Sequence, residues 1–276
     1  MRTPRTFSAL MRHAVLLTTS LLMVFPLVWA VSVSIKPPTE IFELGFHLWP
    51  RTFAGLENYG QAISRVPLIR FLLNGVFVCT SIFLIQILIA LPCAYALAKL
   101  RFRGRDTFFS AVLIGLLIPP QVLAIPLFVL FYVGRVLDTY VALILPWTIS
   151  VFGIFLMRQF FRTVPDDLVH AARIDGLSEF AIVWRIMLPI AMPALIAFGT
   201  FSVVAHWNDL FWPLIAIQSE RYATPPLGLL QFRNDEAGSD FGPLMAGAVL
   251  ITTPLVLAFL FAQRWFIEGI TLGAVK

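Results

Sequence analysis

Residues 170–194 read HAARIDGLSEFAIVWRIMLPIAMPA, a polar segment in a chain whose neighbouring stretches are almost wholly apolar. The segment carries four charged side chains, Arg173, Asp175, Glu179 and Arg185. It ends with two prolines, Pro189 and Pro193. Proline ends or kinks a helix because it lacks a backbone N–H and fixes its φ angle. The pattern therefore predicts a short polar structure attached directly to a long apolar helix.

The composition of the chain is that of a membrane protein. Of its 276 residues, 59% are hydrophobic and 13% are charged, and the mean hydropathy is +0.88. Charged residues make up about 25% of an ordinary soluble domain, so the fraction here is about half of that. The net charge of +5 could indicate a nucleic-acid surface, but basic residues also flank membrane spans on the cytoplasmic side. We therefore expect a polytopic protein in a lipid bilayer, with no nucleic-acid partner.

Six segments are predicted to cross the membrane, because a helix needs about 20 apolar residues to span the hydrocarbon. The predicted spans are 14–35, 72–98, 108–133, 140–160, 190–217 and 243–266. The first could be mistaken for a cleaved signal peptide, but its apolar stretch exceeds the roughly 7 to 15 residues of such a signal. The sequence thus predicts an all-α membrane protein with a single transmembrane domain over residues 1–276.

The basic residues predict the orientation, because cytoplasmic loops carry an excess of Lys and Arg. With the N-terminus inside, thirteen of the twenty basic residues lie on the cytoplasmic side. They are Arg2, Arg5, Arg12, Lys99, Arg101, Arg103, Arg105, Arg158, Arg162, Arg173, Arg185, Arg264 and Lys276. We therefore expect both termini in the cytoplasm, and the polar segment falls in a cytoplasmic loop over 161–189.

The sequence carries no recognisable catalytic motif. A phosphate-binding P-loop needs Gly directly before its Lys, and none of Lys36, Lys99 and Lys276 follows a glycine. The four histidines are scattered singly, which predicts no metal site, and the two cysteines are expected to be small packing residues. A membrane enzyme is therefore disfavoured, and the energy source is expected in a partner or an ion gradient.

Two short helices are expected in the cytoplasmic loop. Thr163 is the expected N-cap of the first helix, which should end near Ile174. Gly176 fits the left-handed position that follows a helix, and Ser178 can cap the second helix, which should end near Pro189. The apolar side of the second helix is expected to consist of Phe180, Val183, Trp184 and Met187. The same pattern fits an amphipathic segment resting on lipid headgroups, so the residues alone leave both interpretations open.

The spacing of residues in this loop resembles a family pattern. The loop contains Ala171-Ala172, then three residues, Gly176, nine further residues and Ile186-x-Leu188-Pro189. This spacing is similar to that of the "EAA" loop of permease subunits of binding-protein-dependent ABC importers. In that family the loop docks on the nucleotide-binding subunit. The docking residues that the resemblance implies are Asp167, His170, Ala171, Ala172, Asp175, Gly176, Ile186, Leu188 and Pro189. The chain departs from the family at His170, where Glu is usual, and at Leu177, where Ala is frequent, so no fixed carboxylate is available at position 170.

Four further stretches resemble the carbohydrate-type branch of this family, whose second permease is similar to the smaller membrane subunit of the maltose transporter. They are LENY at 56–59, LIPPQVLAIPLF at 117–128, WNDLFWPL at 207–214 and QRWFIEGITLGAVK at 263–276. The resemblance implies a multi-pass protein of a prokaryotic cell membrane and a sugar-like substrate. It implies a second permease, two copies of an ATP-binding subunit and an extracytoplasmic solute-binding protein as partners. ATP and Mg²⁺ would then bind to the ATPase partner, with no cofactor in this chain.

Polar residues within the spans are candidates for a substrate pathway, because a charged side chain at the centre of a membrane helix costs about 2.5 to 3.5 kcal/mol on insertion scales. In the fifth span, spacings of four and three residues place Ser202, His206 and Asp209 on one helical face. In the third span, a cluster of prolines should interrupt the helix near Gln121. The candidates are Gln121, Ser202, His206, Asn208 and Asp209. Packing explains these residues equally well. In the fifth span, His206 and Asp209 could hold each other and a partner subunit. In the third span, the prolines could simply kink a packing helix.

An ion-coupled secondary transporter or channel subunit is the alternative to an importer permease. Internal repeats would favour that alternative, and the sequence shows none. The importer interpretation leaves the solute open among mono-, di- and oligosaccharides, polyols and glycerol phosphates. It also leaves open whether this subunit or its partner permease holds the substrate.

The predicted orientation determines which positions a membrane-impermeant thiol reagent reaches in intact cells. Ser239→Cys should react, because residue 239 precedes the last span on the outside, whereas Ser178→Cys should be protected in the cytoplasm. Labelling is measured by the mass shift of the purified protein. Both variants should react in permeabilised cells, which is the control. Reaction at position 178 in intact cells would contradict the orientation.

Overall fold

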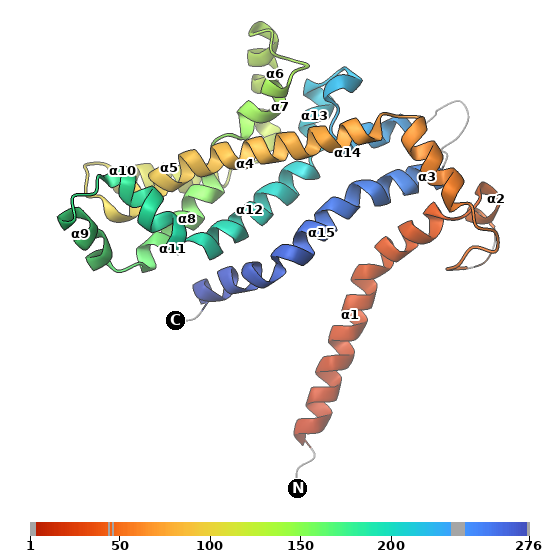
Figure 1. Ribbon diagram of the computed structural model, residues 1–276, viewed down its shortest axis with the longest axis horizontal. Helices are drawn as coiled ribbons and strands as arrows, with labels where there is room; N and C mark the ends of the chain where they lie inside the picture. Colours follow the sequence, from red (N-terminus) through yellow and green to blue (C-terminus); the bar gives the residue numbers. More distant parts are fainter. Residues whose placement is uncertain (1–3, 44, 46, 233–240, 275–276) are drawn as a thin grey trace. The chain divides into compact units, whose positions relative to one another are not determined.

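The computed structural model describes residues 4–43, 45, 47–232 and 241–274 (Figure 1). Every regular element in these ranges is a helix, so the predicted all-α class is confirmed for this part of the chain. Residue 239 lies outside the described ranges. Contacts between residues divide the chain into two compact units, Met1–Ile69 with Leu229–Pro254 and Arg70–Gly228 with Leu255–Lys276.

The first unit is organised around a buried asparagine. Its elements are α1 (Pro4–Ser34), α2 (Pro38–Ile41), α3 (Gly55–Ser64), η5 (Leu230–Phe232) and the first part of α15 (Phe241–Ala274). The amide of Asn58 in α3 donates to the carbonyl oxygens of Ser34 and Lys36, at 3.0 and 2.9 Å. A Cβ on Gly242 of α15 would lie 2.6 Å from the side-chain oxygen of Asn58. Asn58 therefore connects the end of α1 to the start of α15.

Most helices belong wholly or almost wholly to the second unit. They are α4 (Leu68–Lys99), α5 (Arg105–Gly115), η1 (Pro120–Leu123), α6 (Ala124–Val133), α7 (Tyr140–Ile144), η2 (Leu145–Trp147), α8 (Val151–Thr163), α9 (Asp166–Ile174), α10 (Glu179–Ile182), the π-helical η3 (Val183–Met187), α11 (Leu188–Ile190), α12 (Met192–Trp207), α13 (Phe211–Ala216), η4 (Glu220–Tyr222) and α14 (Pro225–Leu229). Within this unit α4 and the later part of α15 run beside α12 (Figure 1).

The predicted spans appear as four long helical segments and two bent pairs. Ala9–Ser34, Leu68–Lys99, Tyr140–Thr163 and Phe241–Gln263 are each long and apolar enough to cross a membrane. The third predicted span is a pair of helices, Arg105–Gly115 and Pro120–Val133, bent by 92°. The described chain therefore offers four spans, or up to six when each bent pair is counted as one.

Prolines lie at both bends. Pro119 is the N-cap of η1, four residues after the end of α5, and Pro120 is the first residue of η1, so the predicted interruption of the third span is confirmed. The second bend, of 84°, lies between the helical run Glu179–Ile190 and α12, whose first turn contains Pro193. Proline is tolerated in the first turn of a helix because the N–H it lacks has no partner there.

A continuous helix over 190–217 was expected for the fifth span, and this prediction is wrong. α12 ends at Trp207, and a separate helix, α13, begins at Phe211. Asp209 lies in the break, where its carboxylate accepts a hydrogen bond from the backbone N–H of Trp212 at 3.3 Å. Asp and Asn side chains compete with helical hydrogen bonds in this way, and they favour the ends of helices over their interiors.

Glycines allow close approach of α4, α8 and α12 in the core of the second unit. A Cβ on Gly153 of α8 would lie 2.5 Å from the ring of Phe198 in α12. A Cβ on Gly199 would lie 2.6 Å from the ring of Phe83 in α4. Phe198 is only 2% exposed, so its ring is confined on all sides. Small residues at such crossings let membrane helices gain van der Waals contact.

Gly153→Ala should destabilise the protein, even though alanine favours a helix more than glycine does. The added methyl group must displace the buried ring of Phe198, and overpacking of this kind costs about 1 to 3 kcal/mol. Gly60→Ala in α3 is the matched control, because no atom lies within 4 Å of a Cβ at that position. Thermal unfolding in detergent should give a lower midpoint for Gly153→Ala only. Equal midpoints for the two variants would show that the Phe198 ring yields freely.

Candidate functional site

The first helix of the loop between α8 and α12 begins later than expected. The prediction of Thr163 as its N-cap is wrong, because Thr163 ends α8 and its hydroxyl donates to the carbonyl oxygen of Phe160 at 2.7 Å. Pro165 occupies the N-cap position in an extended conformation. α9 then runs from Asp166 to Ile174, which is the end that the sequence predicts.

A left-handed glycine turns the chain between the two helices of the loop. Gly176 has a φ of +81°, in agreement with the prediction, and a Cβ there would meet nothing within 4 Å. The predicted cap Ser178 is also confirmed, since its hydroxyl oxygen accepts from the backbone N–H of Ala181 at 3.3 Å. The helical run that follows ends at Ile190, one residue beyond the predicted Pro189.

The two helices and their flanking residues, 164–191, form a folded segment that we call the knuckle. Its inner side is buried and apolar. The inner residues are Val164, Val169, Ala172, Ile182, Val183, Met187 and Ala191. They share one core with Leu91, Ala94 and Tyr95 of α4 and with Met157 and Phe161 of α8. Burial of a large aliphatic side chain stabilises by about 1.5 to 3 kcal/mol, so the knuckle is anchored on these helices as well as through its chain ends.

The outer side of the knuckle carries most of the predicted docking residues. Asp167, His170, Ala171, Asp175, Gly176 and Pro189 are exposed, Ile186 and Leu188 are half-buried, and Ala172 is buried. Two large apolar residues outside the predicted docking set are also exposed, Ile174 by 85% and Phe180 by 66%. Phe180 was expected on the apolar side of the second helix, but it is not buried with Val183 and Met187. Ile174 and Phe180 both flank the glycine turn, and their position next to Gly176 is the signal that could have found them. Exposed apolar groups rimmed by polar residues are typical of an interaction surface.

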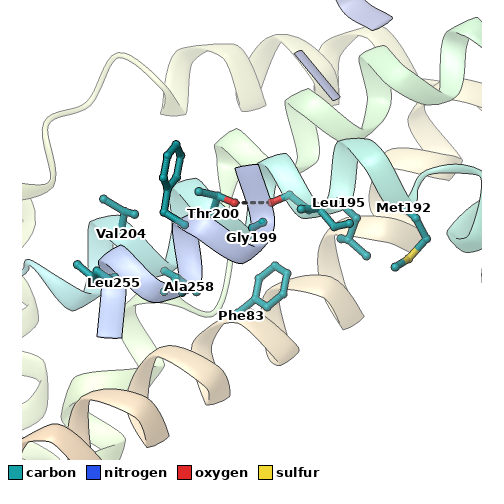
Figure 2. Close-up of a pocket in the computed structure, with 12 residues that line it drawn as sticks. Phe83, Met192, Leu195, Gly199, Thr200, Val204, Leu255 and Ala258 are labelled. Atoms are coloured by element: carbon teal, nitrogen blue, oxygen red, sulfur yellow. Dashed lines mark hydrogen bonds between the residues drawn. The ribbon is translucent and has the colours of Figure 1, made fainter. Parts of the chain in front are cut away.

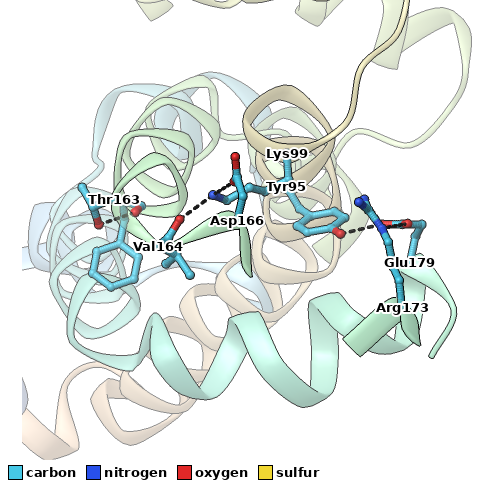
Figure 3. A network of polar contacts seen from close by, with 8 residues as sticks. Tyr95, Lys99, Thr163, Val164, Asp166, Arg173 and Glu179 are labelled. Atoms are coloured by element: carbon cyan, nitrogen blue, oxygen red, sulfur yellow. Dashed lines mark hydrogen bonds and ion pairs between the residues drawn. The ribbon is translucent and has the colours of Figure 1, made fainter. Parts of the chain in front are cut away.

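Two side chains of α4 bind the knuckle (Figure 3). The ammonium group of Lys99 donates to the carbonyl oxygen of Val164 and to Oδ1 of Asp166, both at 2.5 Å. One turn earlier, the hydroxyl of Tyr95 donates to Oε2 of Glu179 at 2.5 Å. The Lys99 ammonium, through its hydrogen bond, holds the pKa of Asp166 below its ordinary value. Asp166 is therefore an ionised acceptor at neutral pH.

Arg173 closes the knuckle on itself. Its Nε and Nη2 donate to the two carboxylate oxygens of Glu179, at 2.7 and 3.2 Å. The hydrogen bond to Glu179 raises the pKa of Arg173 above its already high ordinary value. Bidentate pairs of this kind fix geometry as well as charge, so the end of α9 is held against the start of α10.

Ser202 and His206 of α12 meet a residue that the sequence analysis did not single out. Gln86 of α4 is buried, and its side-chain oxygen accepts from the Ser202 hydroxyl at 2.6 Å. Its amide nitrogen donates to the carbonyl oxygen of Trp147 at 2.7 Å and to Nε2 of His206 at 3.3 Å. A lone amide in an apolar run was the available signal. The polar stripe of α12 thus binds α4 of the same chain.

The other predicted pathway residues lie apart from Gln86. Asp209 is not on the helical face expected for it, because α12 ends before it. Among the described residues, no side-chain hydrogen bond or ion pair joins Asp209 to His206, and only the backbone N–H of Asp209 donates to the carbonyl oxygen of His206, at 3.4 Å. Both residues line one cavity of about 10 Å³, room for roughly one water. Asn208 and Gln121 are exposed.

A larger cavity of about 310 Å³ lies between α4, α12 and the middle of α15 (Figure 2). Its lining includes Phe83, Leu195, Val204 and Ala258. The hydroxyl of Thr200, the lining's single polar side chain, already donates to the carbonyl oxygen of Ile196 at 2.8 Å. A sugar placed there would leave its hydroxyl groups without partners, which is costly. This cavity is therefore no candidate for a polar solute.

Comparison with known proteins identifies the family. Residues 86–271 match the model of the family described as binding-protein-dependent transport system inner membrane component. The chain belongs to this family. It is a transmembrane permease subunit and a multi-pass membrane protein. The match confirms the resemblance inferred from the loop spacing.

Three relatives match this permease over more than nine tenths of both chains. The arabinooligosaccharides transport system permease protein AraQ of Halalkalibacterium halodurans is 36% identical over 256 residues, 92% of this chain and 91% of the relative. AraQ of Bacillus subtilis is 34% identical over 264 residues, 93% and 92% of the two chains. The sn-glycerol-3-phosphate transport system permease protein UgpE of Yersinia enterocolitica is 30% identical over 265 residues, 94% of each chain.

A solved structure shares the fold of the permease. It is described as a bacterial ABC transporter involved in the import of the acidic polysaccharide alginate. The likeness has a TM-score of 0.84 and covers 96% of this chain and 98% of the other. The two sequences are 22% identical, so the likeness establishes the fold and nothing more specific.

Gln86→Leu should lower the thermal stability of the permease. The substitution leaves the Ser202 hydroxyl, the His206 ring and the Trp147 carbonyl without their partner, and each unpaired buried polar group costs about 1 to 3 kcal/mol. Gln121→Leu makes the same chemical change at an exposed position, so its unfolding midpoint should stay close to that of the unmodified permease. Unfolding is followed in detergent. An unchanged midpoint for Gln86→Leu would show that these groups find other partners.

Proposed function

We propose that the permease forms half of the translocation pathway of an ABC importer for a sugar or related polyol, with residues 1–276 as one permease domain. The knuckle is the observation that carries this proposal, because its polar outer side is exposed while its inner side is packed into the core of the transmembrane helices. Relatives named for arabino-oligosaccharides and for glycerol phosphate support a hydroxyl-rich solute. Because these names differ, they support a class of solute rather than one compound.

In this proposal the energy comes from a partner. Two copies of an ATP-binding subunit bind ATP and Mg²⁺, and one of them docks on the outer side of the knuckle. The docking surface consists of eight of the nine residues predicted from the sequence, together with Ile174 and Phe180. The ninth, Ala172, is buried on the inner side of the knuckle and does not take part. Closure of the ATPase pair pushes on the knuckle, and the short link from Pro189 to Pro193 carries the push across the 84° bend into α12.

Two further partners complete the importer. A second permease subunit supplies the other half of the pathway, and an extracytoplasmic solute-binding protein delivers the solute. In this proposal the permease crosses a prokaryotic cell membrane six times. Both termini and the knuckle then lie in the cytoplasm, on the same side as the ATPase subunits. The bias of basic residues toward that side supports this orientation.

The candidate pathway residues take different roles in this proposal. Gln121 and Asn208 are exposed, so their amides are available to sugar hydroxyls. Ser202 and His206 shape the pathway indirectly, because both hold α12 to Gln86 of α4. Asp209 lies at the break between α12 and α13, where a change in helix direction would move it.

Gly176→Ala and Gly176→Leu together test docking on the knuckle. Both residues have a Cβ and incur the same strain at a φ of +81°, about 1 kcal/mol or more. A Cβ meets nothing within 4 Å inside the permease, so only the longer leucine side chain reaches toward a partner. We expect Gly176→Leu to reduce recovery of the ATP-binding subunit in a pull-down far more than Gly176→Ala does. Uptake of a labelled arabino-oligosaccharide per ATP hydrolysed should fall with it.

His170→Glu is the control for this docking test. It restores the residue that is usual at this position in the family, so the ATP-binding subunit should be recovered in normal amounts. Membrane insertion is checked by the amount of permease in the membrane fraction, which should be equal for all variants. Normal recovery and normal transport with Gly176→Leu would mean that the knuckle does not dock on the ATPase.

A further inference from the structure

We propose that Tyr95 and Lys99 are positioning residues that lock the knuckle to α4, so that α4 moves together with α12 when the knuckle is pushed. The inference rests on the proposed function, in which the ATPase pushes the knuckle. It adds a second membrane helix to the path of that motion, beside the chain connection through Pro189 and Pro193. It also assigns a role to two residues that lie outside the loop itself.

The two residues are placed to act together. Tyr95 and Lys99 are four residues apart in α4, so they lie on one face of the helix, one turn from each other. Leu91, a further turn away on that face, is fully buried in the core shared with the knuckle. One stripe of α4 therefore presents an apolar residue, a hydroxyl and an ammonium group to the knuckle.

The two polar contacts hold different helices of the knuckle. Lys99 binds the carbonyl oxygen of Val164 and the carboxylate of Asp166, at the start of α9. Tyr95 binds Glu179, the first residue of α10. Arg173 joins the end of α9 to the same Glu179 (Figure 3). Movement of either helix away from α4 therefore stretches at least one of these bonds.

Burial makes this lock strong on the α4 side. The side chain of Lys99 is 4% exposed and Tyr95 is 2% exposed, so water has little access to either side chain. A buried ammonium group without acceptors is strongly disfavoured. The two carboxylates are more exposed, 72% for Asp166 and 45% for Glu179, so charge attraction alone would be weak here. The lock depends on the buried donors of α4.

α4 also carries the contact that transfers motion to α12. Gln86 lies nine residues before Tyr95, about 13 Å along the helix axis, and it binds Ser202 and His206 of α12. The knuckle is continuous with α12 at its other end. Knuckle, α4 and α12 thus form a closed ring of contacts, so a movement of the knuckle is passed to both helices.

The experiment follows an ATP-dependent change at the far end of α12 and needs no transported solute. Ala205→Cys places a thiol at an exposed position in the last turn of α12, in a permease whose Cys79 and Cys93 are replaced by alanine. The complete importer is reconstituted in vesicles, and the rate of maleimide labelling is measured with and without ATP and Mg²⁺. ATP hydrolysis and recovery of the ATP-binding subunit are measured on the same samples. Tyr95→Phe, Lys99→Met and the double variant are then introduced.

We expect the double variant to assemble and to hydrolyse ATP. The effect of ATP on the labelling rate should be reduced by about tenfold, because one hydrogen bond to a charged group corresponds to about this factor. Each single variant should show a smaller reduction. Lys99→Arg keeps a charged donor and should restore most of the response. Tyr132→Phe is the matched control, because Tyr132 is 68% exposed and distant from the knuckle in the chain.

The outcomes separate this proposal from the docking proposal. A normal ATP response in the double variant would overturn the role of Tyr95 and Lys99, and docking would still stand if Gly176→Leu lost the ATP-binding subunit. Loss of ATPase recovery in the double variant would also overturn the positioning role, because the two residues would then only maintain the fold of the knuckle. The docking proposal itself would be contradicted by two results together: a labelling rate in the reference permease that does not change with ATP, and normal recovery of the ATP-binding subunit with Gly176→Leu.

Discussion

Burial of the knuckle's inner side against α4 and α8 is the interaction on which the arrangement of the second unit depends. A polar loop with free ends would move independently of the membrane helices and could transmit no force to them. Here Val169 and Ala172 of α9, together with Ile182 and Met187 of the second helix, are nearly inaccessible to solvent in a core shared with α4 and α8. The cost of exposing these side chains keeps the outer surface in a fixed position relative to those helices.

Polar contacts give this packing its direction. α4 presents buried donors at two levels, Gln86 toward α12 and the pair Tyr95 and Lys99 toward the knuckle. Hydrogen bonds in an apolar environment are directional and expensive to leave unmade, whereas apolar contacts tolerate sliding. A helix that is packed by apolar groups and fixed by polar groups at two heights has a defined rotation and register. α4 is for this reason the central helix of the second unit.

Local features of the site followed from local sequence. Gly176 was predicted in a left-handed turn and Ser178 as a helix cap, because each depends only on neighbouring backbone groups. Thr163 failed as a cap for a related reason: Pro165, two residues later, already fixes an extended backbone, and α8 extends to include Thr163. Asp209 failed as part of a helical face because its carboxylate binds the backbone N–H of Trp212 and favours a break.

The sequence by itself determined the all-helical membrane class, the family and the two-helix form of the loop between α8 and α12. These follow from apolar length, from prolines and glycines at fixed places and from a specific spacing around Gly176. Only the tertiary structure decided the partners of the polar side chains. Gln86 and His206 are 120 residues apart, and Tyr95 and Glu179 are 84 apart. Such pairs depend on which faces of separate helices meet, and periodicity within one helix holds no information about the helix that packs against it.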